Sequence, residues 1–149
     1  NVTGARISFL VGRPDVIAAC KKLRTQIDFG MFLPVQKAAI AALTGPLDSV
    51  KRQCGEYQAR RDALCGGLRS IGWNVPDSHG SMFVWAPLPT GYTDSMAFCL
   101  ELIDKAGVIC TPGFSFGPSG EGYVRFALTL PVERIREAVA SIAASGMIR

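Results

Sequence analysis

The sequence predicts an α/β fold in which helices pack against a small sheet. In five stretches the apolar residues recur every three or four positions, the spacing that places them on one face of a helix. Shorter runs, such as residues 82–89 and 123–128, are continuously apolar or alternate with polar residues, as β-strands do. Glycine and proline separate these runs, which indicates short, ordered connections.

The composition is that of a globular domain. The 149 residues are 48% hydrophobic and 19% charged, and the chain is long enough to bury a core. The formal charge of +4 comes from 16 basic and 12 acidic residues in small scattered groups, which is typical of solvated helix faces. With no basic stripe, no membrane-spanning run and no signal peptide, we expect a soluble, cytoplasmic protein that binds neither nucleic acid nor membrane.

The cysteines and the single histidine indicate no metal site. Five cysteines fall at wide, irregular spacings without a Cys-x-x-Cys pair, at Cys20, Cys54, Cys65, Cys99 and Cys110. This pattern predicts reduced thiols in the core and excludes a disulfide framework. His79 lies in a turn-rich segment without a well-placed acid or nucleophile, so we interpret it as a loop residue.

The amino-terminal part predicts one strand and two helices. Residues 7–11, Ile-Ser-Phe-Leu-Val, predict a short buried strand after a turn. Pro14 suits the first position of a helix whose apolar residues continue to Ile27, and this face is expected to lie on a core. A second, alanine-rich helix is predicted over residues 34–43, with Gly45 as its left-handed cap.

A single long helix is predicted over residues 47–71. The positions on its apolar face alternate steps of three and four and carry a single charged residue, Arg61: Leu47, Val50, Cys54, Tyr57, Arg61, Leu64, Leu68 and Ile71. Such a seam also suits pairing with another chain as a coiled coil. The elements expected next are strands at 73–76 and 82–89, a helix capped by Thr93 and ended by Gly107, and a buried strand at 108–110.

The last predicted strand carries a candidate binding residue. Alternation places Tyr123, Arg125 and Ala127 on one face and Val124, Phe126 and Leu128 on the other. An arginine among apolar residues is costly to desolvate unless an anion meets it. The same alternation fits a strand whose arginine face is simply open to water. A final helix is expected from Pro131.

Arg6 is the second candidate, because it lies where a predicted turn meets a predicted strand. A guanidinium at such an edge is well shaped to bind phosphate or carboxylate oxygens in bidentate fashion. A solvated end residue would show the same pattern.

Residues 1–7, Asn-Val-Thr-Gly-Ala-Arg-Ile, resemble the second half of the pyridoxal-phosphate attachment signature of class I and II aminotransferases. In that family the signature lysine forms the Schiff base with the cofactor. By this register the lysine precedes Asn1, so we expect the chain alone to be inactive. Ser8 departs from the Gly or Ala of the family. The Pro-Gly-x-x-Phe-Gly loop at 112–117 and the Tyr-Val-Arg-Phe-Ala strand at 123–127 extend the resemblance.

The resemblance implies the carboxyl-terminal part of a fold-type I transferase. Residues 1–47 would end the large cofactor-binding domain, and residues 48–149 would form the linker helix and the small α/β sandwich domain. Arg6 would bind the phosphate of pyridoxal 5'-phosphate, and Arg125 would bind the α-carboxylate of the substrate. The reaction implied moves an amino group from an amino acid to a 2-oxo acid in a homodimer. Within this aspartate aminotransferase-like family, residues 27–32 are most similar to the LL-diaminopimelate aminotransferase branch.

Two alternatives share these features. Other enzymes of the same cofactor fold, including decarboxylases and acyl-transferring synthases, have the same pair of arginines. Aminotransferase-like modules also serve as ligand-sensing domains of some transcription regulators, and a winged helix-turn-helix ahead of Asn1 would indicate that class.

Overall fold

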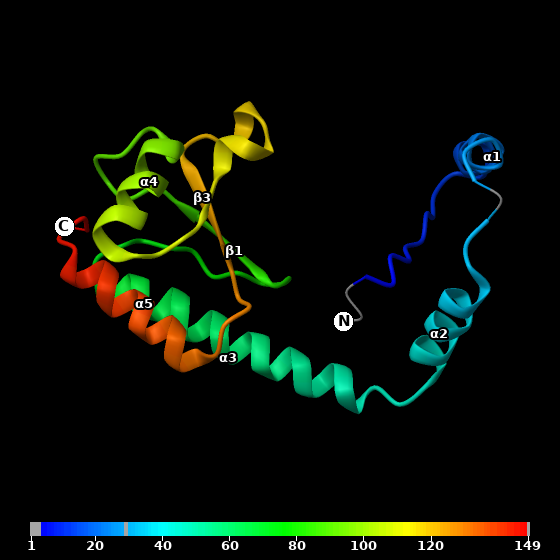
Figure 1. The fold of residues 1–149 in the computed structure, drawn as a ribbon, viewed down its shortest axis with the longest axis horizontal. Helices are drawn as coiled ribbons and strands as arrows, with labels where there is room; N and C mark the ends of the chain where they lie inside the picture. Colours follow the sequence, from blue (N-terminus) through cyan, green and yellow to red (C-terminus); the bar gives the residue numbers. More distant parts are fainter. Residues whose placement is uncertain (1–3, 29, 149) are drawn as a thin grey trace. The chain divides into compact units, whose positions relative to one another are not determined.

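The computed structural model describes residues 4–28 and 30–148. Its contacts divide the chain into two compact units, Asn1–Ser49 and Val50–Arg149. Figure 1 shows the helices and strands of each unit in the order of the chain.

In the first unit, residues 4–28 and 30–49 form two helices, α1 (Pro14–Arg24) and α2 (Leu33–Thr44). Both begin with proline in the first turn, where the missing N–H group is not needed. In α1, Asp15 lies in the first turn and basic side chains lie in the last, so both ends complement the helix dipole. The two predicted helices of this unit are therefore confirmed.

The predicted burial of this unit is wrong for the residues that the structure describes. Neither helix has a buried residue, and residues 7–11 are irregular instead of forming a strand. Phe9, Leu10 and Val11 are 70%, 62% and 88% exposed. A strand needs a neighbour to accept and donate its backbone hydrogen bonds, and an apolar helix face needs a surface to pack on. Neither a pairing strand nor a surface that buries a helix face is present within residues 4–28 and 30–49.

Gly45 ends α2 in a conformation that differs from the predicted one. Its φ of −83° and ψ of −177° are extended, not left-handed. The next residue is Pro46, whose ring restricts the residue before it to extended conformations. The proline therefore decides the end of this helix.

The second unit is built on a three-stranded antiparallel sheet. Strand β3 (Tyr123–Ala127) lies between β1 (Phe83–Pro87) and β2 (Thr111–Pro112). The predicted strands at 73–76 and 108–110 are irregular, which corrects two further assignments. The apolar residues of both segments still enter the core, because Trp73, Val75 and Cys110 are buried.

Three helices cover one face of this sheet: α3 (Asp48–Ser70), α4 (Ser95–Ala106) and α5 (Val132–Ala144). Gly67 permits close packing of α3 on α5, since a Cβ atom there would lie 3.0 Å from both methyl carbons of Val139. Figure 1 shows the two helices beside the strands. The centre of the core is formed by Leu64, Leu68, Trp73, Val84, Phe98, Leu102, Val124, Phe126 and Ile142.

Two helix predictions need correction in detail. The seam of α3 is buried only toward its end, at Leu64 and Leu68, whereas Val50 is 52% exposed. Asp94, and not Thr93, caps α4, because its Oδ1 atom accepts hydrogen bonds from the backbone N–H groups of Met96 and Ala97, both at 2.9 Å. The end of α4 at Gly107, with φ +64°, is as predicted.

The cysteines are free, as predicted, but only three of them are buried. Cys65, Cys99 and Cys110 lie in the core, while Cys20 and Cys54 are exposed. The Sγ atoms of Cys99 and Cys110 are 3.3 Å apart, and burial raises the pKa of both thiols. Both side chains belong to the buried core of this unit. Within the described ranges no three metal-ligating side chains cluster, and no helix has the length and apolarity to cross a membrane.

Candidate functional site

Arg125 lies at the middle of the central strand, on the face that the helices leave uncovered. Val124 and Phe126 point into the core and are 0% and 5% exposed, while Tyr123 on the opposite face is 38% exposed. The predicted alternation is thus confirmed. Arg125 itself is half-buried, on a strand face that is open to solvent.

Among the residues that the structure describes, the guanidinium of Arg125 contacts aromatic rings and no carboxylate. Its Cζ atom lies 4.2 Å from the ring centroid of Phe83 and 4.4 Å from that of Phe116. Distances below about 6 Å allow attraction between the cation and the π-electrons. Arg125 makes no side-chain hydrogen bond or ion pair with any residue that the structure describes. Its N–H groups are therefore available to an anion from outside.

Two further rings complete an aromatic cluster around this cation, which we define as Phe83, Trp85, Phe116 and Tyr123. Trp85 stands directly opposite Arg125 in the register of β1 and β3. Its ring meets Phe116 edge to face, with centroids 5.5 Å apart, and stacks on Tyr123 at 5.6 Å. These geometries are the favourable ones for aromatic pairs, so the rings hold one another in place.

Phe116 comes from a tight loop made of the short 3-10 helices η1 (Gly113–Phe116) and η2 (Pro118–Gly120). The backbones of Gly113 and Gly120 touch, since a Cβ atom on Gly113 would lie 2.0 Å from the carbonyl oxygen of Gly120. Only glycine fits at such a distance.

The same loop is tied to α4 by Ser95 and Glu121. The backbone N–H of Phe114 donates to the hydroxyl of Ser95, at 3.3 Å, and Ser95 is fully buried. The Glu121 carboxylate accepts from the backbone N–H groups of Ser95, at 2.8 Å, and of Gly122, at 3.0 Å. One side chain therefore links the start of α4 to the turn before β3.

The bonds to Glu121 predict an acid-dependent loss of stability. The N–H donors of Gly122 and Ser95 lower the pKa of this carboxyl in the folded state. A lowered folded pKa gives stability that is present above the ordinary pKa and is lost as pH falls through the folded pKa. We expect Glu121→Gln to have a lower free energy of unfolding than the parent protein at pH 7. The difference between the two proteins should shrink progressively below about pH 4. Urea unfolding of both proteins between pH 3 and pH 7 measures the difference, and a gap that stays constant over that range would contradict the prediction.

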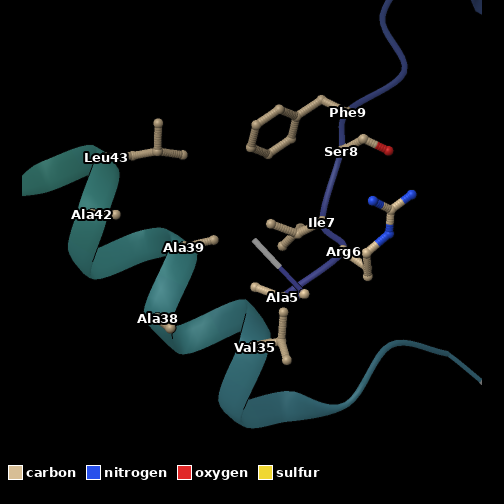
Figure 2. Close-up of a pocket in the computed structure, with 11 residues that line it drawn as sticks. Ala5, Arg6, Ile7, Ser8, Phe9, Val35, Ala38, Ala39, Ala42 and Leu43 are labelled. Atoms are coloured by element: carbon tan, nitrogen blue, oxygen red, sulfur yellow. The ribbon is translucent and has the colours of Figure 1, made fainter. Parts of the chain in front are cut away.

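Arg6, the other candidate, belongs to the first unit. It lines a cavity of about 570 Å³ between residues 4–9 and one face of α2. In Figure 2 the side chains of Ile7 and Phe9 point toward α2, while those of Arg6 and Ser8 point away from it. The α2 side of the cavity is entirely apolar, formed by Val35, Ala38, Ala39, Ala42 and Leu43.

Arg6 has an unusual backbone and an uncommitted side chain. Its φ of +51° is in the left-handed region, which costs a non-glycine residue about 1–2 kcal/mol. Strained positions of this kind concentrate at functional sites. The side chain is exposed and forms no hydrogen bond or ion pair with residues 4–28 or 30–148. Arg6 and Arg125 thus each present an unpaired guanidinium, from different units.

Sequence reasoning missed the residues that surround Arg125. Alternation along the strand at 82–89 places Phe83 and Trp85 on one face, and the loop pattern contains Phe116. Those signals identify aromatic residues but not their neighbour, because the register between β1 and β3 is not visible in either segment alone.

The comparisons with known proteins agree with the resemblance seen in the sequence. Residues 1–142 match the family described as "Aminotransferase class I and II". An LL-diaminopimelate aminotransferase of Halothermothrix orenii is 45% identical over 139 residues, which cover 93% of this chain and 36% of that protein. One from Moorella thermoacetica is 46% identical, over 93% of this chain and 35% of its own length. The chain therefore spans about a third of these relatives.

Solved structures show the same fold. Substrate-bound BacF from Bacillus subtilis matches 92% of this chain and 35% of its own, with a TM-score of 0.82 and 30% identity. An aminotransferase from Staphylococcus aureus matches 95% of this chain and 38% of its own, with a TM-score of 0.82 and 34% identity. The predicted α/β class is confirmed, and the structure corresponds to a fragment of the fold-type I aminotransferase fold. On both sequence and structure, this chain belongs to the class I and II aminotransferase family.

Proposed function

We propose that this chain forms the carboxyl-terminal part of a pyridoxal-phosphate-dependent enzyme that transfers an amino group from an amino acid to a 2-oxo acid. In this proposal residues 1–47 end the large domain, and residues 48–149 form the linker helix and the small domain. Membership of the aminotransferase family supports the reaction. The division of the chain into compact units at Ser49 and Val50 supports the domain assignment.

The observation that carries the proposal is that the guanidinium of Arg125 has no polar partner among the described residues. A guanidinium on an exposed strand face, held by two aromatic rings and without a carboxylate partner among the residues described, has its planar edge available. That edge matches a carboxylate, which it binds through two parallel N–H···O bonds. In the proposed enzyme Arg125 binds the α-carboxylate of the substrate and fixes its orientation.

Arg6 is proposed to bind the phosphate of the cofactor. Its exposed, unpaired guanidinium offers N–H donors in the fork geometry that suits phosphate oxygens, so the residue fits this role. When bound, pyridoxal phosphate supplies the electron sink for the chemistry at the α-carbon of the substrate. The two arginines of this chain supply charge and orientation for that chemistry.

The names of the relatives support LL-diaminopimelate as the amino-acid substrate. The resemblance to the family extends the proposal to a cytoplasmic homodimer with shared active sites.

Substitution of Arg125 tests the proposal in the full-length protein loaded with pyridoxal phosphate. We expect Arg125→Gln to reduce kcat/KM for LL-diaminopimelate by about 100-fold to 10,000-fold, because two charge-assisted hydrogen bonds of about 1.5–3 kcal/mol each are removed. The rate is measured from the change in cofactor absorbance on mixing with LL-diaminopimelate alone. Arg125→Lys should retain part of the activity, since it keeps the charge but not the fork.

Arg134→Gln is the matched control for this experiment. Arg134 is an exposed arginine of α5 that pairs with Glu137, and its loss should leave kcat/KM unchanged. Arg6→Gln is the complementary variant, and it should weaken the binding of pyridoxal phosphate. If Arg125→Gln retains kcat/KM within threefold of the parent protein, Arg125 does not bind the substrate and the proposed site is wrong.

A further inference from the structure

We propose that Phe83 and Phe116 are positioning residues that hold the Arg125 guanidinium ready for the substrate carboxylate. This inference rests on the proposed function, in which Arg125 binds that carboxylate. It assigns to two rings of the aromatic cluster the orienting role that a carboxylate side chain would otherwise have.

The contacts of Arg125 explain why rings suit this role. The Cζ atom lies 4.2 Å from the centroid of Phe83 and 4.4 Å from that of Phe116, so the cation is attracted to both. Ring faces restrict the long side chain but do not occupy its N–H donors, which point outward in the plane of the guanidinium. An Asp or Glu partner would also orient the arginine, but it would use those donors and neutralise the charge. The rings therefore leave the binding edge free.

A restrained arginine binds an anion more tightly than a mobile one. Ordering a long side chain on binding lowers affinity, and holding it beforehand in the bound conformation removes that cost. Arg125 makes no polar side-chain contact with the described residues. The two rings therefore provide the restraint on its guanidinium.

Phe83 is placed by its position on β1, and Phe116 by a contact with another ring. Phe83 lies on β1 opposite Ala127, one position along the same face from Trp85, which stands opposite Arg125. The rings of Phe116 and Trp85 meet edge to face, with centroids 5.5 Å apart. Although Phe116 is 49% exposed, its place is therefore determined by a neighbouring ring.

The loop that carries Phe116 is anchored to buried structure. The contact between Gly113 and Gly120 closes the loop on itself. The buried Ser95 accepts a hydrogen bond from the backbone of Phe114, and Glu121 accepts one from the backbone of Ser95. These contacts fix the loop relative to α4, so the position of Phe116 is set by the core of the unit.

The test replaces Phe116 in the full-length protein with bound pyridoxal phosphate. We expect Phe116→Leu to raise the KM for LL-diaminopimelate by about fivefold to tenfold, with kcat within about twofold, because the carboxylate is held equally before and during the reaction. Phe116→Tyr retains the ring and should restore the parent KM. Phe114→Leu is the matched control, since Phe114 lies in the same 3-10 helix, is 50% exposed and makes no ring contact with Arg125.

A double-mutant cycle shows whether Phe116 acts through Arg125. With Arg125→Lys as the background, Phe116→Leu should raise KM by less than twofold, because its effect depends on the guanidinium. An undiminished effect in that background would overturn the inference, and so would a KM for Phe116→Leu equal to that of Phe114→Leu. In both cases a large effect of Arg125→Gln would leave the proposed function standing, whereas a silent Arg125→Gln would remove both.

Discussion

Truncation of Trp73 to alanine is expected to lower the free energy of unfolding of the Val50–Arg149 unit by about 3–5 kcal/mol. Trp73 is only 1% exposed. Its ring meets Phe98 of α4 at a centroid distance of 5.3 Å and Phe126 of β3 at 5.7 Å, edge to face in both pairs. Its Nε1–H donates to the carbonyl of Pro87 at 2.7 Å. The substitution therefore removes packing on a helix and a strand and leaves a carbonyl without its donor.

Two companion variants separate these contributions. Trp73→Phe keeps a ring in the core but loses the bond to Pro87, and should cost about 1–3 kcal/mol. Trp85→Phe alters the other tryptophan, which is 37% exposed, and should cost less than about 1 kcal/mol. Urea unfolding followed by far-ultraviolet circular dichroism measures all three. If Trp73→Ala and Trp85→Phe lowered the free energy of unfolding by the same amount, the central place of Trp73 in the core would be contradicted.

Replacement of Gly113 with alanine should destabilise the same unit by about 3 kcal/mol or more. The new Cβ atom would lie 2.0 Å from the carbonyl oxygen of Gly120 and 2.6 Å from that of Tyr123. Both clashing atoms are backbone, so they cannot turn aside as a side chain can. The clash can be removed only if the loop separates from β3. We therefore also expect the ring of Phe116 to lose its contact with the Arg125 guanidinium.

Gly66→Ala is the matched control for this substitution. Gly66 lies within α3, and beyond its chain neighbours and the nearby backbone of its own helix no atom lies within 4 Å of the position its Cβ would take. Alanine is favoured over glycine inside a helix, so this variant should gain about 0.5–1 kcal/mol. The same chemical change is thus expected to have opposite signs at two sites, and urea unfolding decides it. A Gly113→Ala protein as stable as the parent would show that the loop does not close in this way.

Local signals in the sequence were sufficient for most helices and for the central strand. Proline near the start predicted α1 and α5, and Gly107 predicted the end of α4. Each of these signals acts within one turn of the chain and needs no distant contact. The alternation from Tyr123 to Leu128 correctly separated a buried face from an open one, because side chains of a strand point to opposite sides whatever surrounds them.

Predictions failed where the outcome depends on a neighbour. The apolar run at residues 7–11 became no strand in the described structure, since a strand exists only when another strand pairs with it. The segments at 73–76 and 108–110 enter the core without joining the sheet. An apolar run predicts that a segment is buried. A buried segment need not form hydrogen bonds with a neighbouring strand.

The sequence by itself therefore determined the class of fold, the order of the helices and the two arginines that are candidates for binding an anion. Only the tertiary structure decided that Arg125 is held by Phe83 and Phe116, residues 42 and 9 positions away from it in the chain. The physical reason is that the register of β1 on β3 and the closure of the loop at Gly113 and Gly120 bring these rings to the guanidinium. Contacts between distant segments leave no periodic signal in either segment, so they appear only when the chain has folded.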